Sequence, residues 1–221
     1  MPIDPTLLAL AGVGLPGAPA LVRDGWDGRL DAAFVHGLAG FLHAARAAGL
    51  IELDERSGRS LDLRVEAEAI RAVQLEGELI RLEPALATLP AVILGGATLA
   101  RGAYPDPLLR PFAGLDLLVA SRCFGAAVET LEGLGYAWGP TEAARRVQTT
   151  AGDSAVSLFH PGGVVVDVHC AIGTGSVAES SQIDELLAEH ERVVIGPALI
   201  PGPSWEAQLV ATALHIVVAT S

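Results

Sequence analysis

The hydrophobic pattern of the chain changes at Pro90, and this change constrains the fold more than any other feature. Before Pro90, apolar residues recur at intervals of three to four, which is the period of an amphipathic helix. After it, short apolar runs alternate with glycine- and proline-rich turns, and these runs cover 91–94, 115–119, 155–159 and 164–169. Such runs are typical of strands. The sequence therefore predicts an α+β fold, with a small mixed sheet flanked by helices.

Three parts are expected along the chain: a helical N-terminal region at 1–90, a core at 91–175, and a C-terminal helical region at 176–221 that packs on the core. In the first part we expect a helix over 27–50, a polar turn at 54–60, and a helix over 61–88 that Pro84 kinks or divides. The later elements are predicted to be a helix from Ser121, a hairpin around 160–163, and then a helix, a strand and a helix at 182–190, 192–195 and 204–219.

Composition excludes several classes of protein. Apolar residues make up 51% of the chain and charged residues 18%, which is too apolar and too weakly charged for disorder. The net charge of −12 argues against a broad nucleic-acid surface, because such a surface needs clustered positive charge. No apolar stretch reaches the length of a membrane span, and the N-terminal apolar stretch lacks the basic start of a signal peptide. Cys123 and Cys170 have no zinc or redox spacing. We therefore expect a cytoplasmic protein.

The first candidate for chemistry is the Gly95-Gly96 pair, which separates a predicted strand from a predicted helix. Two glycines allow the backbone to approach a ligand closely, and a helix N-terminus offers free N–H groups to an anion. The same pair also occurs wherever a strand needs a tight turn into a helix, without any ligand. A phosphate-binding turn and a purely structural turn both fit the sequence here.

The second candidate is Asp116, which interrupts the apolar run "LDLLV" at 115–119. A carboxylate within a buried strand needs a cation or hydrogen-bond donors. Asp116 shares its strand face with Gly114, two residues earlier. A ligand position is one interpretation, and an acid that caps the strand or pairs with an arginine is the other.

The third candidate is the pair Asp167 and His169 in "VVVDVHC". Alternation along a strand places both side chains on one face, opposite Val166 and Val168. Two polar groups on one face of an otherwise apolar strand favour a site. The alternative is a hairpin edge that faces solvent.

Together these stretches resemble a bacterial family of uncharacterised nucleotidyltransferases in the DNA polymerase β-like superfamily. The resemblance covers about 80 residues and rests on "AVILGGATLARGAYPDPLLRPFAGLDLLV", "LEGLGY" and "VVVDVHCAI", in the family's order. The family's usual pattern has Leu-Lys-Gly after the first strand, then Arg-Pro, Asp-x-Asp-Leu-Leu-Val, Gly-Tyr and Val-Asp-x-His.

This resemblance implies a Mg²⁺-dependent site that binds a nucleoside triphosphate and transfers its nucleoside monophosphate to a small-molecule or peptide acceptor. By position, Asp116 corresponds to the second acid of the Asp-x-Asp pair and Asp167 to the third acid, so both would be metal ligands and catalytic. The turn of Gly95 and Gly96 would hold phosphate oxygens, as would Arg110, which matches the motif arginine.

Two departures from the family pattern bear on activity. Gly114 stands where the family has its first metal-binding acid, and Gly95 stands where it has a lysine. Asp106 and Asp153 are acids nearby in the sequence, but neither occupies the strand position of the missing acid. Both departures affect the phosphate–metal site, so they weaken the prediction of activity without affecting the prediction of the fold.

Three functions therefore remain open on the sequence. The first is nucleotidyl transfer with a reduced metal site. The second is a degenerate protein that binds a nucleotide or a partner without transfer. The third is a metal-independent pocket in which Asp116, Asp167 and His169 carry out acid–base chemistry. Similar nucleotidyltransferase-like proteins occur in bacterial natural-product gene clusters, and that resemblance is what suggests the third function.

Overall fold

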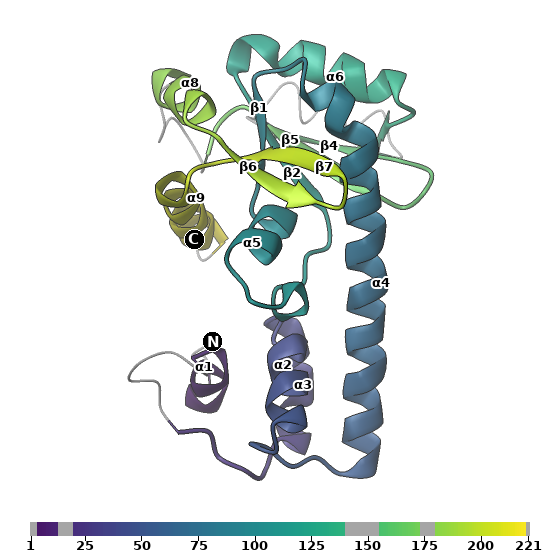
Figure 1. Cartoon of the computed structure of the whole chain (residues 1–221), viewed down its shortest axis with the longest axis vertical. Coiled ribbons are helices and arrows are strands. Elements are labelled where there is room, and N and C mark those ends of the chain that lie inside the picture. Colours follow the sequence, from purple (N-terminus) through teal and green to yellow (C-terminus); the bar gives the residue numbers. More distant parts are fainter. Residues whose placement is uncertain (1–3, 13–19, 140–154, 173–179, 220–221) are drawn as a thin grey trace. The chain divides into compact units, whose positions relative to one another are not determined.

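The computed structural model describes residues 4–12, 20–139, 155–172 and 180–219 (Figure 1). The fold is α+β, as the sequence predicts. In chain order the elements are α1 (Pro5–Ala11), η1 (Asp27–Arg29), α2 (Leu30–Val35), α3 (Ala39–Ala47), α4 (Glu55–Leu86), β1 (Ala91–Leu94), α5 (Gly96–Gly102), η2 (Pro107–Leu109), β2 (Leu115–Val119), η3 (Ser121–Cys123), α6 (Phe124–Gly133), β3 (Ala137–Trp138), β4 (Ala155–Phe159), β5 (Val165–His169), α8 (Ser180–Ala188), β6 (Glu191–Ile195), β7 (Ala198–Gly202) and α9 (Trp205–Ala219).

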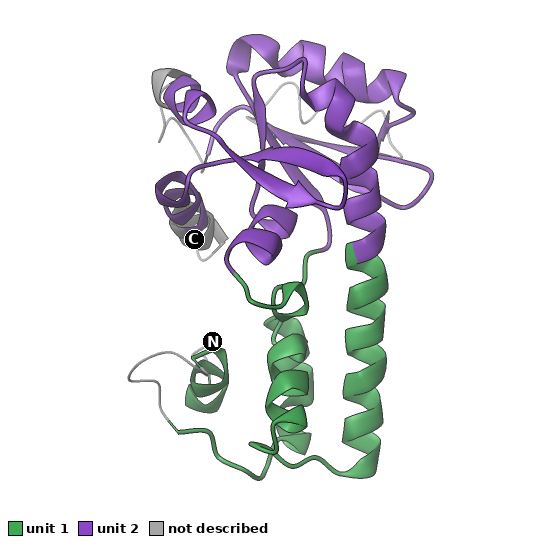
Figure 2. Ribbon diagram, viewed as in Figure 1, with its two compact units in different colours: residues 1–72, 104–112 green, residues 73–103, 113–221 purple. Residues whose placement is uncertain are grey.

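The chain forms two compact units, which Figure 2 shows in green and purple. The first contains residues 1–72 and 104–112, and the second contains residues 73–103 and 113–221. The division falls inside α4, so each unit includes part of that helix. The boundaries at residues 90 and 175 that the sequence pattern suggests stay predictions.

In the first unit, the single helix predicted over 27–50 is wrong, because the chain turns at Gly37. This glycine has a φ of 68°, a left-handed conformation that glycine adopts at little cost. The N–H of Gly37 donates to the carbonyl of Phe34, and the N–H of Leu38 donates to the carbonyl of Ala33. These bonds end α2 as helices commonly end, with their last carbonyls satisfied by residues beyond the helix. The apolar stripe nevertheless continues into α3.

The polar turn predicted at 54–60 is also wrong, because α4 begins at Glu55. Asp54 caps this helix: its Oδ1 accepts the backbone N–H of Ser57 at 2.7 Å. That hydrogen bond holds the pKa of the Asp54 carboxyl below its ordinary value. The cap satisfies an otherwise orphaned donor and starts the helix earlier than its apolar residues indicate. Pro84 lies inside α4, near its end at Leu86, and does not divide it.

A close backbone contact joins α3 to η2 within the first unit. A Cβ added to Gly40 would lie 2.0 Å from the carbonyl oxygen of Leu108, a separation that real Cβ atoms essentially never show. Only glycine therefore permits this approach without movement of the backbone. This unit also contains a hydrophobic cluster, whose buried residues are Leu7, Leu10, Trp26, Leu30, Ala33, Ala39, Leu42, Ala45, Ile51, Leu61 and Val65.

Replacement of Gly40 by alanine should lower the free energy of unfolding by about 1–3 kcal/mol, the usual cost of overpacking. Urea denaturation measures this change. Gly77→Ala is the matched control, because Gly77 lies within α4 and a Cβ there meets nothing within 4 Å. That variant should gain roughly 0.5–1 kcal/mol from its better helix propensity. Equal effects of the two substitutions would contradict the close contact.

The second unit contains a mixed five-stranded sheet in the order β1-β2-β5-β4-β3. Strands β2 and β5 are parallel, and the other neighbouring pairs are antiparallel. The predicted hairpin is present as β4 and β5. The short strand β3 and the β6–β7 hairpin are additional, since the sequence predicted only a strand at 192–195 in that region. Strand β7 contacts β1 at the edge of the sheet.

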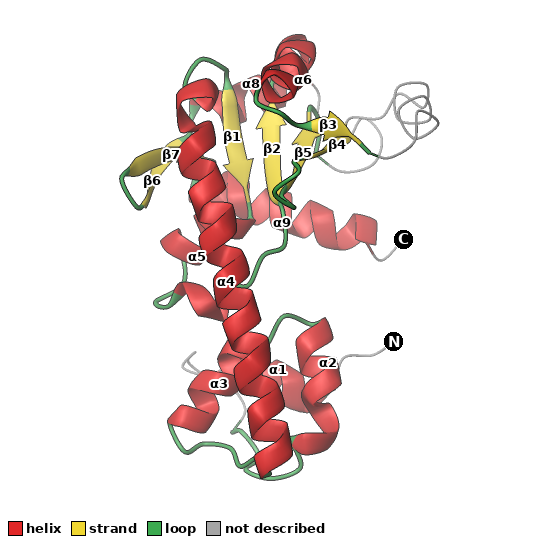
Figure 3. Ribbon diagram, turned by 90° about the vertical axis from the view of Figure 1, so that its right-hand side faces the viewer, coloured by secondary structure: helices red, strands yellow, loops and turns green. Residues whose placement is uncertain are grey.

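The two faces of the sheet differ in polarity. One face is completely apolar and buried, with Ile93, Leu115, Leu117, Val119, Val156, Leu158, Val166 and Val168. Helix α4 lies on that side and α9 on the other (Figure 3). On the α9 side, Val92 and Leu118 pack with Ile183, Leu187 and Ala211 of α8 and α9. Asp116, Asp167 and His169 lie on this second face by strand alternation.

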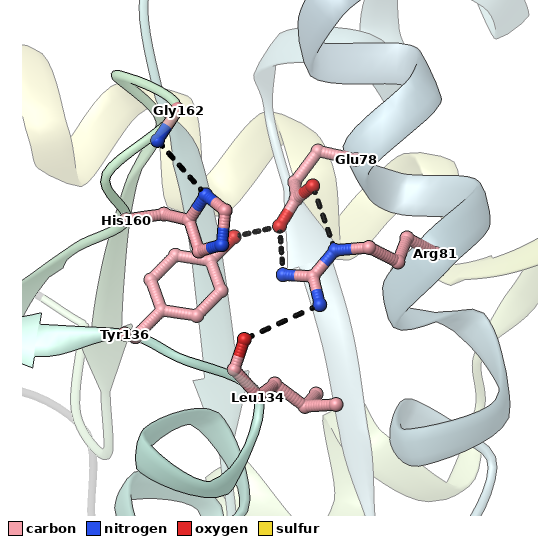
Figure 4. Close-up of polar contacts among 6 residues, drawn as sticks. All are labelled: Glu78, Arg81, Leu134, Tyr136, His160 and Gly162. Carbon is pink, nitrogen blue, oxygen red and sulfur yellow. Dashed lines mark hydrogen bonds and ion pairs between the residues drawn. The ribbon is translucent and has the colours of Figure 1, made fainter.

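A buried carboxylate joins α4 to the segment after α6 (Figure 4). Glu78 is 9% exposed and accepts hydrogen bonds from the guanidinium of Arg81, at 2.9 and 2.5 Å, and from the hydroxyl of Tyr136. Arg81 also donates to the carbonyl of Leu134 at 3.3 Å. Burial raises the pKa of Glu78, but the donors from Arg81 and Tyr136 outweigh it and leave the pKa below 4.5. The ring of His160 lies 5.1 Å from that of Tyr136.

Removal of the Tyr136 hydroxyl as Tyr136→Phe should lower the free energy of unfolding by about 1–3 kcal/mol at pH 7, because it takes a donor from a buried carboxylate. A lowered folded-state pKa contributes stability that is present above the ordinary value of 4.5 and is lost as the pH falls through the folded-state pKa. The difference from wild type should therefore shrink below about pH 4.5 in denaturation curves.

Tyr104→Phe is the control for that experiment, because it removes the hydroxyl of the other tyrosine, whose ring contacts Phe41 edge to face. A loss that is equal in both variants, or that is constant from pH 7 to pH 3, would contradict the role given to the Glu78 carboxylate.

Among the residues that the structure describes, no helix combines the length and the apolar character needed to cross a membrane.

Candidate functional site

The candidate site is built on strands β2 and β5, whose parallel pairing brings two predicted site residues together. Asp116 and Asp167 are direct partners in the register of this pair. Leu94, at the end of β1, is the partner of Asp116 on one side, and Ser157 of β4 is the partner of Asp167 on the other. Residues that pair across a sheet point to the same face. The two carboxylates and the Ser157 hydroxyl therefore form one row.

Each carboxylate of this row has a polar partner on the sheet. The Nε2 of His169 lies 3.1 Å from Oδ1 of Asp116, diagonally across the β2–β5 pair. The hydroxyl of Ser157 donates to Oδ1 of Asp167. The side chain of Asp116 is 47% exposed and that of His169 is 27% exposed. The row is thus accessible to a ligand, and each of its two acids has a hydrogen-bond partner.

The Gly95-Gly96 turn lies next to this row, since it directly follows Leu94. Both glycines have a positive φ, 53° at Gly95 and 40° at Gly96, and ψ of Gly95 is −140°. That combination is far outside the regions open to other residues. The lysine that the family pattern has here would be strained in this backbone. Glycine at position 95 therefore suits the conformation of this turn.

Gln208 of α9 fixes the turn from the other side. Its side chain is 5% exposed, and its Oε1 accepts the N–H of Gly95 at 3.1 Å. The Nε2 of Gln208 donates to Thr212 at 3.3 Å. The carbonyl of Gly95 accepts the hydroxyl of Thr98 at 2.7 Å. Both backbone groups of Gly95 are consequently bonded within the protein, which holds the turn in place beside the row.

Two other residues singled out in the sequence belong to the first unit, and a third is outside the described residues. Arg110 belongs to the first unit, where its Nη1 donates to the carbonyl of Pro111 at 3.0 Å. Asp106 is in the same unit and caps η2, with Oδ1 accepting the N–H of Leu108 at 2.9 Å. Asp153 is outside the described residues. Within the row, the structure brings together Asp116, Asp167 and His169.

Gly114 immediately precedes β2 and carries no acid, but the position has room for one. A Cβ built there meets only the carbonyl oxygen of Val165, at 3.6 Å, which is an ordinary contact. In the parts of the chain that the structure describes, no cluster of three or more His, Cys, Asp and Glu side chains is suited to a metal ion. The acids of the row are Asp116 and Asp167, on neighbouring strands.

Sequence reasoning missed Ser157 and Gln208. Ser157 is a polar residue between the buried Val156 and Leu158, and this alternation is visible in the sequence, but its pairing with Asp167 depends on the hairpin register. Gln208 is a polar residue in the apolar helix "WEAQLVATALHIVVA". Its contact with Gly95 joins segments 113 residues apart, which no local pattern reveals.

A model of one protein family matches residues 23–220 of the chain. Its description is "Uncharacterised nucleotidyltransferase". The chain belongs to this nucleotidyltransferase family. The family resemblance in the sequence motifs is thereby confirmed.

Comparison with solved structures finds similarity between this family member and a crystal structure of the lincosamide antibiotic adenylyltransferase LnuA in its lincomycin-bound form. The two chains share 19% sequence identity, with a TM-score of 0.37, and the match covers 61% of this chain and 82% of the other. No curated protein matches the chain.

Proposed function

We propose that the chain binds a nucleoside triphosphate at the row of Asp116 and Asp167, and transfers its nucleoside monophosphate to a hydroxyl of a small-molecule or peptide acceptor. One observation carries the proposal: the two acids are in register on adjacent parallel strands, on the partly open face, next to a glycine turn. Membership of a nucleotidyltransferase family supports this reaction class. The net charge of −12 and the absence of lysine agree with a small ligand more than with a nucleic-acid strand.

The donor chemistry of the row fits one Mg²⁺ ion. Magnesium prefers hard oxygen ligands and is often held by one or two carboxylates together with substrate phosphates and water. Asp116 and Asp167 would be the protein ligands. When bound, the ion would neutralise phosphate charge and increase the electrophilicity of the transferred phosphorus. A site with two metals fits less well, because Gly114 contributes no carboxylate to it.

His169 provides a base near the proposed ligand. With the proton on Nε2, the ring donates to Asp116, and Nδ1 is the nitrogen that can accept a proton. In the proposed reaction the acceptor oxygen forms a bond with the α-phosphorus, the bond from that phosphorus to the bridging oxygen breaks, and pyrophosphate leaves. The hydroxyl proton passes to Nδ1 of His169. Asp116 orients the ring for this transfer, as carboxylates commonly do for catalytic histidines.

Nucleotide binding without transfer is the second candidate function, and Gly114 is the observation that favours it. A site without its first acid can still hold the phosphates through one cation, while the attacking oxygen lacks activation by a second cation. The metal-independent acid–base function is the third, supported by the Asp116–His169 contact alone.

Calorimetric titration with ATP, GTP, CTP and UTP, each with and without Mg²⁺, tests the proposal. We expect at least one nucleotide to bind, and its affinity to increase with Mg²⁺. Asp167→Asn should weaken this Mg²⁺-dependent binding by at least about tenfold, since even the loss of an outer partner of a metal ligand costs about that much. Glu132→Gln is the control, because that acid lies on α6 and accepts the indole N–H of Trp138.

Absence of binding for all four nucleotides under both conditions would contradict the proposed site. Binding that is equal with and without Mg²⁺, and indifferent to Asp167→Asn, would support a pocket without a metal. Pyrophosphate release in the presence of a hydroxyl acceptor separates transfer from simple binding.

Gly114→Asp tests whether the row is a metal site that lacks one ligand. The position accommodates a Cβ, so the variant should fold with little change in melting temperature. It should lower the Mg²⁺ concentration needed for half-maximal nucleotide binding by about tenfold, as a third carboxylate adds a hard, charged ligand. Gly133→Asp is the control, because it adds the same charge on α6, where a Cβ meets nothing within 4 Å.

If Gly114→Asp and Gly133→Asp change the Mg²⁺ dependence equally, only net charge matters, and the row is not a metal site.

A further inference from the structure

Ser157 is a side chain of the row for which neither the motifs nor the family match provides a role. It lies in the middle of β4, opposite Asp167, and its hydroxyl donates to Oδ1 of that acid. Its neighbours Val156 and Leu158 are buried on the other face of the sheet. Ser157 itself is half-buried. The hydroxyl is thus partly shielded from water at the point where it meets the carboxylate.

We infer that Ser157 is a positioning residue for Asp167, and that it determines which oxygen of this acid is offered to a cation. Because Oδ1 uses one lone pair to accept the serine proton, Oδ2 is the oxygen better able to bind the ion. This inference rests on the proposed function, because it gives Ser157 a role in the same site. Residues that hold a metal-binding carboxylate typically change the affinity for the ion by 10–100-fold when they are removed.

The two acids of the row are held by chemically different groups. Asp116 contacts the imidazole of His169. Asp167 accepts from an aliphatic hydroxyl, which is a neutral donor. The hydroxyl of Ser157 is therefore the contact that orients Asp167 on this face.

The size of the side chain at position 157 also matters. Directly paired residues on one face have Cβ atoms about 4.5–5.5 Å apart, so a short hydroxyl side chain reaches the neighbouring carboxylate without leaving the strand. Threonine keeps the hydroxyl at the same Cβ and suits a strand. Alanine removes the hydroxyl and little else. Ser157→Thr and Ser157→Ala therefore separate the hydrogen bond from the packing.

The hydrogen bond itself can be tested without nucleotide or metal, by carbodiimide labelling of carboxylates followed by peptide mass spectrometry. Loss of the serine donor should increase the labelling of Asp167 several-fold in Ser157→Ala, and Asp116 in the same molecule should be unchanged. Ser157→Thr should label like wild type. Ser121→Ala is the control, since its hydroxyl donates to the carbonyl of Cys170 and to no acid. Equal labelling of Asp167 in wild type and Ser157→Ala would overturn the inference.

The consequence for the ion is tested by nucleotide binding at a series of Mg²⁺ concentrations. Ser157→Ala should raise the half-saturating Mg²⁺ concentration by about tenfold. Ser157→Thr should restore the wild-type value, and the melting temperatures of the variants should agree. An unchanged Mg²⁺ dependence in Ser157→Ala, or an equal loss in Ser157→Thr, would overturn the positioning role. If wild type binds no nucleotide, the proposed function fails, and the labelling result still decides whether Ser157 holds Asp167.

Discussion

The parallel pairing of β2 with β5 is the interaction on which the candidate site depends. Parallel strands cannot be joined by a tight turn, so the chain between them forms α6 and then returns through β4. The register of the pair places Asp116 opposite Asp167, 51 residues later in the sequence. A slip by one residue would turn one of the acids to the apolar face, where a charge without partners is costly. Burial of the apolar face therefore fixes the register of β2 with β5, and this register places Asp116 next to Asp167.

The difference between the two sheet faces explains why the site is on the α9 side. On the α4 side every inward residue of the central strands is aliphatic and buried. On the α9 side, Val92 and Leu118 pack with α8 and α9, and Leu94 packs partly buried against the same cluster. Asp116 is the register partner of Leu94, so the row lies beside this packing. Gln208 of α9 accepts a hydrogen bond from the glycine turn. The helix that packs on this face of the sheet therefore also fixes the turn beside the row.

Much of this arrangement was predictable from local sequence patterns. The alternation in "VVVDVH" placed Asp167 and His169 on one face, and the turn around His160 predicted the hairpin of β4 and β5. Helix boundaries were less predictable. Asp54 starts α4 through a side-chain cap within a stretch whose composition is typical of a turn, and Gly37 breaks a helix whose apolar period continues. In both cases one hydrogen-bonding arrangement overrides the pattern of the surrounding residues.

The remaining features depend on register and on distant contacts. Ser157 meets Asp167 only because β4 pairs with β5 in this register. Gln208 meets Gly95 only because α9 packs next to the end of β1. The sequence motif suggests that Gly95 replaces a lysine of the family pattern. The backbone angles of Gly95 indicate instead a turn that requires glycine. Such positions cannot be predicted from a motif, because a motif records residue identity and not the backbone conformation around it.

The most direct test of the proposed nucleotide site is a crystal structure with a bound nucleoside triphosphate and Mn²⁺ in place of Mg²⁺, in which anomalous scattering locates the ion. Carboxylate oxygens accept either cation. We expect one anomalous peak bonded to carboxylate oxygens of both Asp116 and Asp167, with the nucleotide phosphates at the same ion. A nucleotide bound elsewhere, or an ion that contacts neither aspartate, would contradict it.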